Sequence, residues 1–208
     1  MGLTINKNSF ELLGIMLGDG CLSRSGGKYI IYISGHKKDD LEYHQSNSKL
    51  LFNKVFNKEI SVKFRRFENT LFIRFSDKKI FEQFKSWGIP VGKKYSELKI
   101  PQIIFKDKHF LLFMKGLFDT DGCLIYSKQH RKYHYYPRIE ITSKSKNFLR
   151  EILIWLKKIG FYGSISFKGR GYRLELPGFK NLELWTKLIG SNNPKHLNKF
   201  QNRNPKLL

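Results

Sequence analysis

Acidic residues are scarce in this chain. Its 208 residues include 17 Asp and Glu against 39 Lys and Arg, which gives a formal net charge of +22. Like charges repel within a compact protein, so an excess of this size usually serves the binding of a polyanion, and nucleic acid is the first candidate. A compositional bias of the source genome is an alternative, although such a bias normally raises Glu as well as Lys.

Cysteines are few, and long apolar runs are absent. The two cysteines, Cys21 and Cys123, occupy equivalent places in an internal repeat, so we expect packing residues rather than a disulfide or metal ligands. No apolar run has the length of a membrane span, no basic amphipathic anchor is evident, and the N-terminus lacks the pattern of a secretory signal. These absences favour an intracellular protein that is not secreted and does not act at a membrane.

One short motif occurs twice. Leu12–Gly20 reads LLGIMLGDG and Met114–Gly122 reads MKGLFDTDG, and each copy is followed by Cys-Leu. Small residues four apart lie on one helix face and let two backbones approach closely. Both copies have such a pair before the acid, namely Gly14 with Gly18 and Gly116 with Thr120. We therefore expect two helices to pack through this face and Asp19 to meet Asp121 at its end, where a shared metal site would explain the pairing of two acids.

Each motif opens a half of the chain with the same plan. Hydrophobic content of 40% and eighteen Phe indicate a folded core. After each motif helix the pattern predicts two strands, an amphipathic helix, two further strands and a last helix, which is the order αββαββα twice. The predicted segments are turns at 23–27 and 128–132, strands at 29–34 and 136–142, helices at 41–56 and 148–159, strand pairs at 61–67 with 70–75 and at 164–169 with 172–176, and closing helices at 79–87 and 182–189.

The duplication predicts the domain organisation of an α+β protein. We expect an N-terminal half over residues 1–94, a linker over residues 95–108 and a C-terminal half over residues 109–208. The tail beyond Ser191 is rich in Asn, Lys and Pro, and we expect it to fray.

Cationic side chains alternate with apolar ones in the predicted strands. Lys63 and Arg65 alternate with apolar residues in the segment VKFRRF, and Arg74, Arg138 and Arg173 are placed likewise in later strands. An antiparallel sheet of this kind has a core on one side and either solvent or an anionic partner on the other. Two such sheets side by side would form a positive trough for duplex DNA, whose major groove admits β-ribbons.

Together these features resemble the LAGLIDADG homing endonucleases, in particular the single-chain members that carry two motifs. The resemblance covers nearly the whole chain: both motifs, their separation, the repeated element order and the basic strands. It implies two pseudo-symmetric halves whose antiparallel sheets form a DNA-binding saddle, with the two motif helices packed at a pseudo-twofold axis. It also implies a monomeric hydrolase for intron homing, a nuclease that cuts both strands of a long, partly asymmetric DNA target and leaves 3′ overhangs.

The resemblance implies that the motif acids bind metal. Asp19 and Asp121 would bind Mg²⁺, with Mn²⁺ or Ca²⁺ able to replace it in binding, and the carbonyls of Gly18 and Thr120 would help. Oxygen-only ligands suit Mg²⁺. Two metals can supply both the water nucleophile and the charge neutralisation that cleavage of a phosphodiester requires.

Further catalytic residues follow from the same resemblance. A polar residue and a basic one after the second strand would order the water network, and the matching pairs are His36 with Lys37 and Ser143 with Lys144. A basic residue on the fourth strand would approach the scissile phosphates; Arg74 fits in the first half, whereas the second half offers only Arg173 or Lys168, slightly out of register. The residues that we expect to contact DNA are Arg24, Lys28, Tyr32, Lys63, Arg65, Arg74, Tyr126, Lys128, Arg131, Arg138, Lys168 and Arg173.

Two binding functions are alternatives to the nuclease. One is a maturase of the same fold that helps a host intron RNA to fold, and the other is a transcription regulator that kept the basic sheets. Relatives without catalytic activity generally lose one of the two acids. Because Asp19 and Asp121 are both present, the sequence favours the enzyme.

Overall fold

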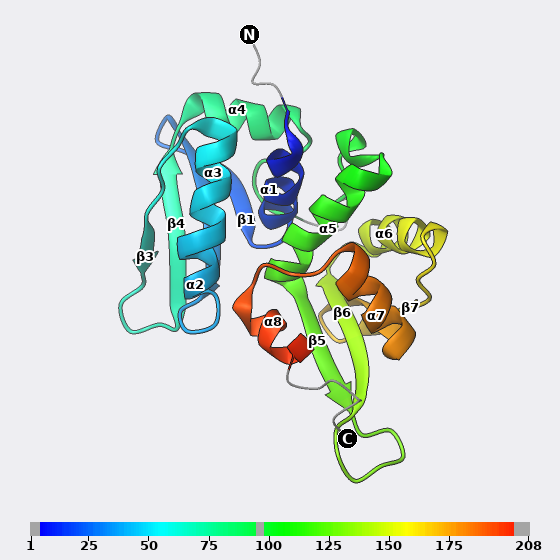
Figure 1. The fold of residues 1–208 in the computed structure, drawn as a ribbon. Coiled ribbons are helices and arrows are strands. Elements are labelled where there is room, and N and C mark those ends of the chain that lie inside the picture. The colour runs from blue at the N-terminus through cyan, green and yellow to red at the C-terminus, as the bar shows by residue number, and fades with distance from the viewer. Residues whose placement is uncertain (1–4, 95–97, 202–208) are drawn as a thin grey trace.

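The computed structural model describes residues 5–94 and 98–201, which form two halves with a repeated order of elements (Figure 1). The N-terminal half consists of α1 (Lys7–Leu17), β1 (Gly20–Ser25), β2 (Lys28–His36), α2 (Leu41–Tyr43), a π-helical turn (His44–Ser48), α3 (Lys49–Phe56), β3 (Val62–Phe64), β4 (Thr70–Ser76) and α4 (Lys78–Ser86). After a 3-10 turn (Gln102–Ile104), the C-terminal half consists of α5 (Asp107–Asp121), β5 (Gly122–Ser127), β6 (Tyr136–Ser143), α6 (Lys146–Lys158), β7 (Ser164–Lys168), β8 (Gly171–Pro177), α7 (Phe179–Leu188) and α8 (Pro194–Gln201).

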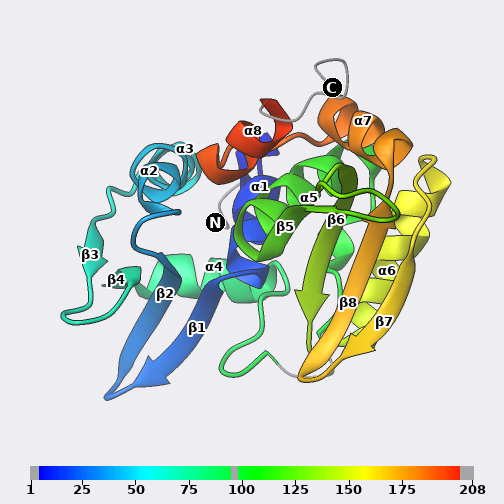
Figure 2. The same ribbon diagram turned by 90° about the horizontal axis from the view of Figure 1, so that it is seen from below.

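Each half contains one four-stranded antiparallel sheet. The strand order is β1-β2-β4-β3 in the first sheet and β5-β6-β8-β7 in the second, so the two sheets have the same topology. Figure 2 shows the sheets on either side of the central helices α1 and α5. The fold is therefore α+β with two αββαββα-like halves, as the sequence predicts. The domain boundary predicted at residue 94 lies after α4, and the one predicted at residue 109 lies in the first turn of α5.

The two central helices approach closely because each carries a glycine where they cross. A Cβ atom added to Gly14 would lie 2.6 Å from the backbone nitrogen of Leu117, and one added to Gly116 would clash with the carbonyl of Glu11. A real side chain does not fit against backbone at such distances, so these glycines set the separation of α1 and α5. The packing of the motif helices through small residues is thus confirmed.

The first central helix begins at a capping box. The side chain of Asn6 accepts hydrogen bonds from the backbone nitrogens of Asn8 and Ser9, and the hydroxyl of Ser9 accepts one from the nitrogen of Asn6. This arrangement satisfies backbone donors at the helix start that have no partner within the helix. Residues 9–17 are all buried, which places α1 inside the protein rather than on its surface.

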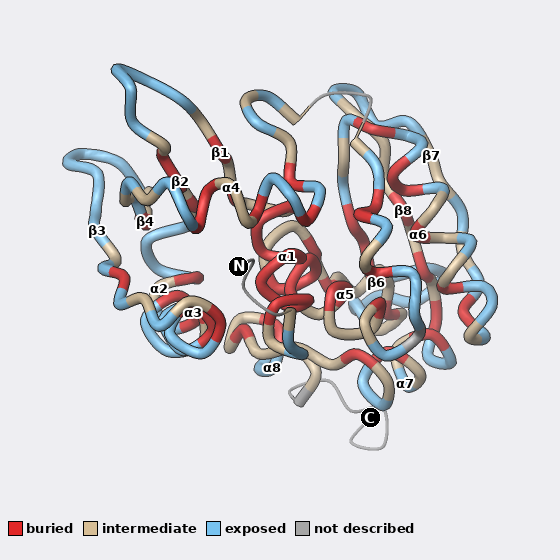
Figure 3. The backbone as a smooth tube through the Cα atoms, turned by 90° about the horizontal axis from the view of Figure 1, so that it is seen from above, coloured by how far each residue is buried: buried red, intermediate tan, exposed pale blue. Residues whose placement is uncertain are grey.

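Apolar side chains from both halves form one continuous buried cluster. It includes residues of α1 and α5 together with the inward faces of both sheets. In Figure 3 the buried segments gather around α1 and α5, whereas the ends of the hairpins are exposed. Burial of apolar surface therefore joins the halves and leaves the sheet ends open to solvent. Among the described residues, none of the helices combines the length and the apolar content that crossing a bilayer requires.

The prediction of a single helix over residues 41–56 is wrong for the middle of that range. A π-helical turn at His44–Ser48 separates α2 from α3. His44 is fully buried, and its Nδ1 lies 2.9 Å from the hydroxyl of Ser48. Such turns within α-helices are frequent at functional sites, and apolar periodicity does not reveal them because it records only which side of the helix is buried.

The expectation that the chain frays beyond Ser191 is also wrong for the residues that the structure describes. Residues 194–201 form α8, and Asn193 is fully buried. Its amide donates hydrogen bonds of 2.9 Å to a carboxyl oxygen of Asp40 and to the carbonyl of Asp119. A polar side chain of the kind that suggested a frayed tail instead donates hydrogen bonds to buried acceptors in both halves.

Candidate active site

The two motif acids lie together at one end of the α1–α5 pair. Asp19 is in the turn between α1 and β1, and Asp121 is the last residue of α5. A Cβ atom added to Gly18 would clash with the hydroxyl of Thr120 and would lie 3.5 Å from the carboxyl carbon of Asp121. The glycine before the first acid therefore lets the second motif approach, and the structure brings these predicted residues to one place.

Burial and mutual repulsion both disfavour two negative charges at this place. Burial, and then the charge of Asp121, raises the pKa of Asp19 to about 7. Burial also raises the pKa of Asp121 to about 6, although the ammonium groups of Lys94 and Lys195 oppose the shift. A bound cation would stabilise both carboxylates in their charged form, so this is a favourable position for one.

Lys94 is a part of the site that the sequence reasoning missed. Its ammonium donates hydrogen bonds to the carbonyl of Leu17 at 2.8 Å and to the carbonyl of Gly18 at 2.5 Å. Burial lowers the pKa of Lys94, and the charges of Asp121 and Asp19 oppose this shift. The lysine thus supplies a positive charge beside both motif acids, from a residue far outside the motifs.

The segment after α4 positions this lysine. The backbone nitrogen of Gly92 donates to the carbonyl of Leu22 in β1 at 2.7 Å, and Val91 forms an isolated bridge with the same residue. Lys94 is two residues after Gly92, and its ammonium contacts the end of α1. The pairing with the edge of β1 joins residues distant in the sequence, and so no local pattern in residues 88–94 predicts it.

A second missed pair, Asp40 and Lys195, also acts on the motif acids. The ammonium of Lys195 donates to Asp40 at 2.7 Å, and the backbone nitrogen of His36 donates to the same carboxylate at 2.8 Å. Burial opposes ionisation of Asp40, but the hydrogen bonds and the charge of Lys195 outweigh it and lower the pKa of Asp40. Both charges act on Asp19, which joins this pair to the site electrostatically.

Residues 191–193 connect the halves next to this pair. The hydroxyl of Ser191 and the backbone nitrogen of Asn192 donate to the carboxylate of Asp119, which is fully buried in α5. The amide of Asn192 donates to Glu11 in α1 at 2.7 Å. Burial raises the pKa of Asp119 to about 7, and these hydrogen bonds oppose the shift. We call residues 191–193 the C-terminal strap, because it ties α1 to α5 and carries Lys195 to the site.

The oxygen atoms at the motif ends fit a hard divalent cation. Within the described ranges, no three His, Cys, Asp or Glu side chains are close enough together to hold a metal ion. Two carboxylates and nearby backbone carbonyls remain, and the carbonyl of Gly18 already binds one cation, the ammonium of Lys94. Oxygen ligands that leave room for water and phosphate are those that Mg²⁺ prefers. The predicted ligands are therefore chemically suited to the predicted metal.

The predicted polar pair of the first half lies at the end of β2. His36 is exposed, and its Nδ1 lies 3.0 Å from the carboxylate of Asp39. The ammonium of Lys37 lies over the ring of Phe64, 5.4 Å from its centre. The backbone of His36 contacts Asp40, so this residue is connected to the site through the main chain, whereas the contact of Lys37 is with β3.

The equivalent pair in the second half is shifted by one residue from the predicted match. Gly20 pairs with Ile33 in the first sheet, and Gly122 pairs with Ile141 in the second. Counting from these isoleucines, the counterpart of His36 is Lys144 rather than Ser143. The hydroxyl of Ser143 accepts a hydrogen bond from the nitrogen of Ser145 at 3.1 Å, at the start of α6.

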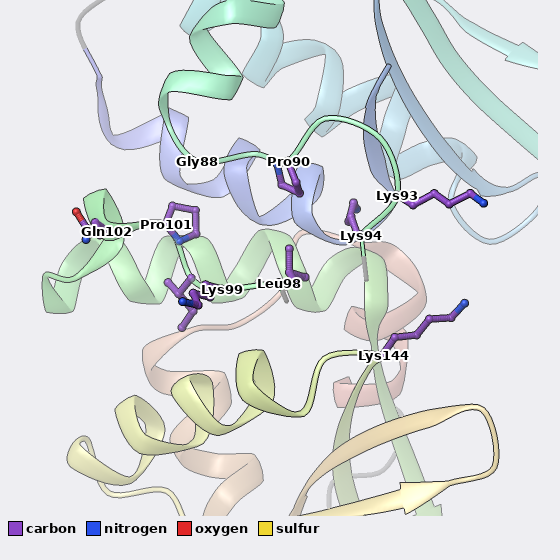
Figure 4. Close-up of a pocket in the computed structure, with 10 residues that line it drawn as sticks. Gly88, Pro90, Lys93, Lys94, Leu98, Lys99, Pro101, Gln102 and Lys144 are labelled. Atoms are coloured by element: carbon purple, nitrogen blue, oxygen red, sulfur yellow. The ribbon is translucent and has the colours of Figure 1, made fainter. Parts of the chain in front are cut away.

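Lys144 shares a cavity with Lys94. This cavity, of about 930 Å³, lies between the segment after α4 and the start of α6, and other lysines line it as well. Figure 4 shows Lys94 near the end of α5, with Lys93 and Lys144 extending nearby. A cavity lined by several lysines, one of which also contacts the end of α1, is suited to an anionic group such as a phosphate.

Arg74 lies where we predict it, but its counterpart is not an arginine. Arg74 is exposed on β4 and pairs with Tyr32, which pairs with Cys21. In the second sheet Cys123 pairs with Glu140, and Glu140 pairs with Glu175. Arg173 and Lys168 are thus out of register, as expected, and the structural counterpart of Arg74 is an acid, Glu175.

Most of the predicted DNA-contacting residues lie on the strand faces that turn away from the helices, which we call the open faces. Alternation with buried residues such as Ile31, Ile73, Ile139 and Leu174 defines these faces. Two of the predicted residues contact each other: the guanidinium of Arg65 donates to the hydroxyl of Tyr32 at 3.3 Å. The predicted residues on the open faces are Lys28, Tyr32, Lys63, Arg65, Arg74, Arg138, Lys168 and Arg173.

Arg24 and Tyr126 lie on the opposite, helix-covered faces, so the structure does not support contact with DNA there. The guanidinium of Arg24 donates to Glu82 of α4 at 2.8 Å and lies 4.7 Å from the ring centre of Tyr29. The hydroxyl of Tyr126 donates to the carbonyl of Lys199 in α8 at 3.2 Å. Each residue lies two positions after a buried leucine, and this period of two could have identified the face.

Lys128 and Arg131 lie in the long connection between β5 and β6, beyond the strands. Both are exposed, and the backbone nitrogen of Arg131 donates to the carbonyl of Lys128 at 2.8 Å. The guanidinium of Arg131 lies 4.5 Å from the ring centre of Tyr135. This loop is a basic and aromatic extension of the second sheet.

The sequence of this chain is similar to those of known proteins. Residues 110–190 match the LAGLIDADG-like domain family. The chain is 23% identical over 168 residues to an uncharacterized protein of Methanocaldococcus jannaschii, covering 77% of this chain and 59% of that protein. It thus spans only part of the curated relatives that it matches. Three longer archaeal proteins, a replication factor C small subunit and two probable translation initiation factors, are covered over 8–14% of their length.

Solved structures of low sequence identity have the same fold. The crystal structure of I-DmoI in complex with DNA and Ca matches with a TM-score of 0.65 and 19% identity, covering 94% of this chain and 97% of that one. The N-terminal LAGLIDADG domain of DUF199/WhiA matches with a TM-score of 0.58 and 16% identity, covering 91% and 86%. The resemblance that the paired motifs predict is confirmed: residues 110–190 match the LAGLIDADG-like domain family, and the chain has the same fold as I-DmoI, a single-chain protein with two LAGLIDADG motifs.

Proposed function

We propose that this protein is a metal-dependent endonuclease that hydrolyses both strands of duplex DNA at a long, partly asymmetric site. The observation that carries the proposal is the juxtaposition of Asp19 and Asp121, with Lys94 beside them, between two sheets whose open faces carry arginine and lysine. Phosphodiester hydrolysis needs charge neutralisation and an activated water, and this site collects the groups that would provide both.

Asp19 and Asp121 would hold the metal, with the carbonyls of Gly18 and Thr120 as further ligands. When bound, Mg²⁺ supplies an activated water and stabilises the leaving 3′ oxygen. The structural relative I-DmoI has been crystallised with DNA and Mn or Ca, and we propose that the same ions can replace Mg²⁺ in binding here. Lys94 would offset the charge of the phosphate at the reacting centre.

The remaining predicted residues would act around this centre. We propose that His36 and Lys144 order water at equivalent ends of β2 and β6, and that Arg74 contacts phosphate from the open face of the first sheet. Because Arg74 and Glu175 occupy equivalent positions with opposite charge, the two strands of the target would be cut in different electrostatic surroundings. The internal duplication supplies both halves of the site in one chain, so we propose a monomer acting on intracellular DNA.

The test is incubation of the protein with a randomised duplex library and Mg²⁺, followed by sequencing of the cut ends. We expect cleavage at one preferred sequence with 3′ overhangs, and none when EDTA is present. A library that is retained by the protein but never cut would contradict the nuclease. Preferred retention of a folded intron RNA over the duplex library would instead support the maturase.

A further inference from the structure

The open face of the second sheet carries two arginines that are already paired with glutamates. Arg138 donates to Glu140 at 2.6 Å, and the guanidinium of Arg173 lies 3.2 Å from the same carboxylate. Glu175 lies 3.9 Å from Arg138 and 3.8 Å from Arg173. Together the four residues form a compact cluster without net charge, which we call the charge quartet. The sequence reasoning treated its arginines as DNA contacts and did not consider its acids.

The equivalent positions of the first sheet hold different chemistry. The strand pairing makes Glu140 the counterpart of Tyr32, and Glu175 the counterpart of Arg74. The first sheet therefore presents an arginine and a tyrosine where the second presents two carboxylates. In a chain with only 17 acids against 39 cations, acids at the centre of a face that meets DNA need a reason other than general composition.

Carboxylates on such a face disfavour non-specific contact with DNA. An ionised carboxylate only accepts hydrogen bonds, so it is repelled by phosphates and by the acceptor atoms of base edges. A favourable partner in the major groove is an amino group, such as N4 of cytosine, whereas arginine pairs best with O6 and N7 of guanine. The arginines of the quartet would therefore bind a G·C pair favourably in the correct orientation, and its carboxylates would make binding to other sequences less favourable.

The arginines of the quartet are also held in fixed positions. Glu140 is 6% exposed and contacts both guanidinium groups, which restricts their rotation before any ligand binds. The Nε of Arg173 is buried without a hydrogen-bond partner among the residues that the structure describes. A guanidinium fixed in this way loses less conformational entropy on binding a base than a free surface side chain does.

We propose that the charge quartet is a specificity-determining element that reads base edges in the half-site of the C-terminal sheet, whereas the cationic open face of the first sheet supplies sequence-independent affinity through phosphate contacts. The inference rests on the proposed function, because it requires that the open faces meet duplex DNA. Specificity then comes partly from repulsion of wrong sequences, which is separable from affinity.

The test compares wild-type protein with the double variant Glu140→Gln/Glu175→Gln, which keeps the side-chain shapes and removes two negative charges. Binding to a randomised duplex library in Ca²⁺ is followed by sequencing of the retained fraction, and affinity for sonicated bulk DNA is measured over a salt series. The control is Glu42→Gln/Glu183→Gln, which removes two exposed charges from α2 and α7. Thermal melting identifies a variant that fails to fold, in which case Glu175→Gln alone, at the more weakly paired acid, replaces the double variant.

We expect the quartet variant to bind bulk DNA more tightly and to lose discrimination at a few adjacent positions of one half-site, by about tenfold, the scale of one lost base contact. The control should keep its discrimination at every position. Unchanged base preferences in a folded quartet variant would overturn the quartet proposal while leaving the nuclease proposal intact. Wild-type protein that retains no preferred sequence would overturn both.

Discussion

The ammonium of Lys94 lies 2.5 Å from the carbonyl oxygen of Gly18, the residue before the first motif acid. This oxygen is one that we also propose as a metal ligand, so the lysine and the metal would share an acceptor. The contact connects the segment after α4 to the end of α1 and places a positive charge beside Asp19 and Asp121. Catalysis in this protein would therefore depend on a residue that neither motif contains.

Replacing either motif acid should separate cleavage from binding. Asp19→Asn and Asp121→Asn each remove a metal ligand, and we expect cleavage to fall by about a thousandfold or more, which corresponds to several kcal/mol of lost stabilisation of the transition state. Affinity for the preferred duplex in Ca²⁺ should change little, because most phosphate contacts lie elsewhere. Single-turnover cleavage and filter binding measure the two effects. Normal cleavage by either variant would refute the assignment of the acids.

Replacing Lys94 should slow the chemical step. For Lys94→Met we expect a loss of about a hundredfold in single-turnover rate, typical of removing one charge-stabilising donor from a reacting centre. Lys94→Arg should recover part of the rate, since it restores the charge. Lys187→Met, an exposed lysine of α7, is the matched control. Equal rates for Lys94→Met and the control would show that Lys94 has no role beyond packing.

Stability should depend on pH in a direction set by the buried acids. The pKa of Asp19 is raised to about 7, that of Asp121 to about 6 and that of Asp119 to about 7. The folded state then binds protons that the unfolded state has lost, so stability should rise as the pH falls from 8 toward 6.5. Thermal melts at several pH values without divalent metal measure this effect. The change in melting temperature per pH unit should be smaller in Asp19→Asn/Asp121→Asn than in the wild-type protein.

Below pH 6.5 two buried histidines should oppose this gain. Burial lowers the pKa of His44 to about 4 and that of His196 to about 3. The unfolded state then binds protons at these two histidines, so the gain in stability per pH unit should become smaller as the pH decreases further. Mg²⁺ needs ionised carboxylates, so it should raise the melting temperature more at pH 8 than at pH 6. An equal Mg²⁺ effect at both pH values would contradict metal binding by the raised acids.

Enlarging the central glycines should destabilise the fold. For Gly14→Ala we expect a loss of about 1–3 kcal/mol in the free energy of unfolding, because the new methyl group meets backbone atoms of α5 rather than movable side chains. Gly26→Asn is a useful control: a Cβ there meets nothing within 4 Å, and asparagine tolerates its φ of 54°. Urea denaturation compares them, and equal stability would mean that the helices can separate without cost.

The C-terminal strap should be a structural requirement rather than a dispensable tail. Asn193→Ala removes the amide that donates to the carbonyl of Asp119 and to Asp40, which then keeps only Lys195 on that oxygen, and we expect a loss of about 1–3 kcal/mol in stability. Asn198→Ala, at an exposed position of α8, should have little effect. Urea denaturation curves compare the stability of the two variants, and similar midpoints would show that the C-terminal strap does not stabilise the fold.

Local patterns predict much of the fold and the centre of the site. The repeated spacing of small residues before Asp19 and Asp121 is enough to predict that two helices pack and that the acids meet. Apolar periodicity predicts the element order, because period and burial are linked within each helix or strand. It fails at His44–Ser48, where a π-helical turn changes the helix without changing its buried side.

The register of the strands and the contacts between distant segments could not be predicted from local patterns. A shift of one residue in a strand exchanges its two faces, and the exact pairing decides that Lys144 matches His36 and that Glu175 matches Arg74. The helix-side positions of Arg24 and Tyr126 depend on the same alternation.

By itself, then, the sequence determined the two-part architecture, the basic character of the sheets and the pairing of Asp19 with Asp121, since each depends on spacing within a short segment. Only the tertiary structure decided that Lys94, Asp40 and Lys195 join these acids, and that two glutamates lie among the arginines of the second sheet. Those relationships depend on how separate segments pack against one another, and their charges and distances arise only when the chain has folded.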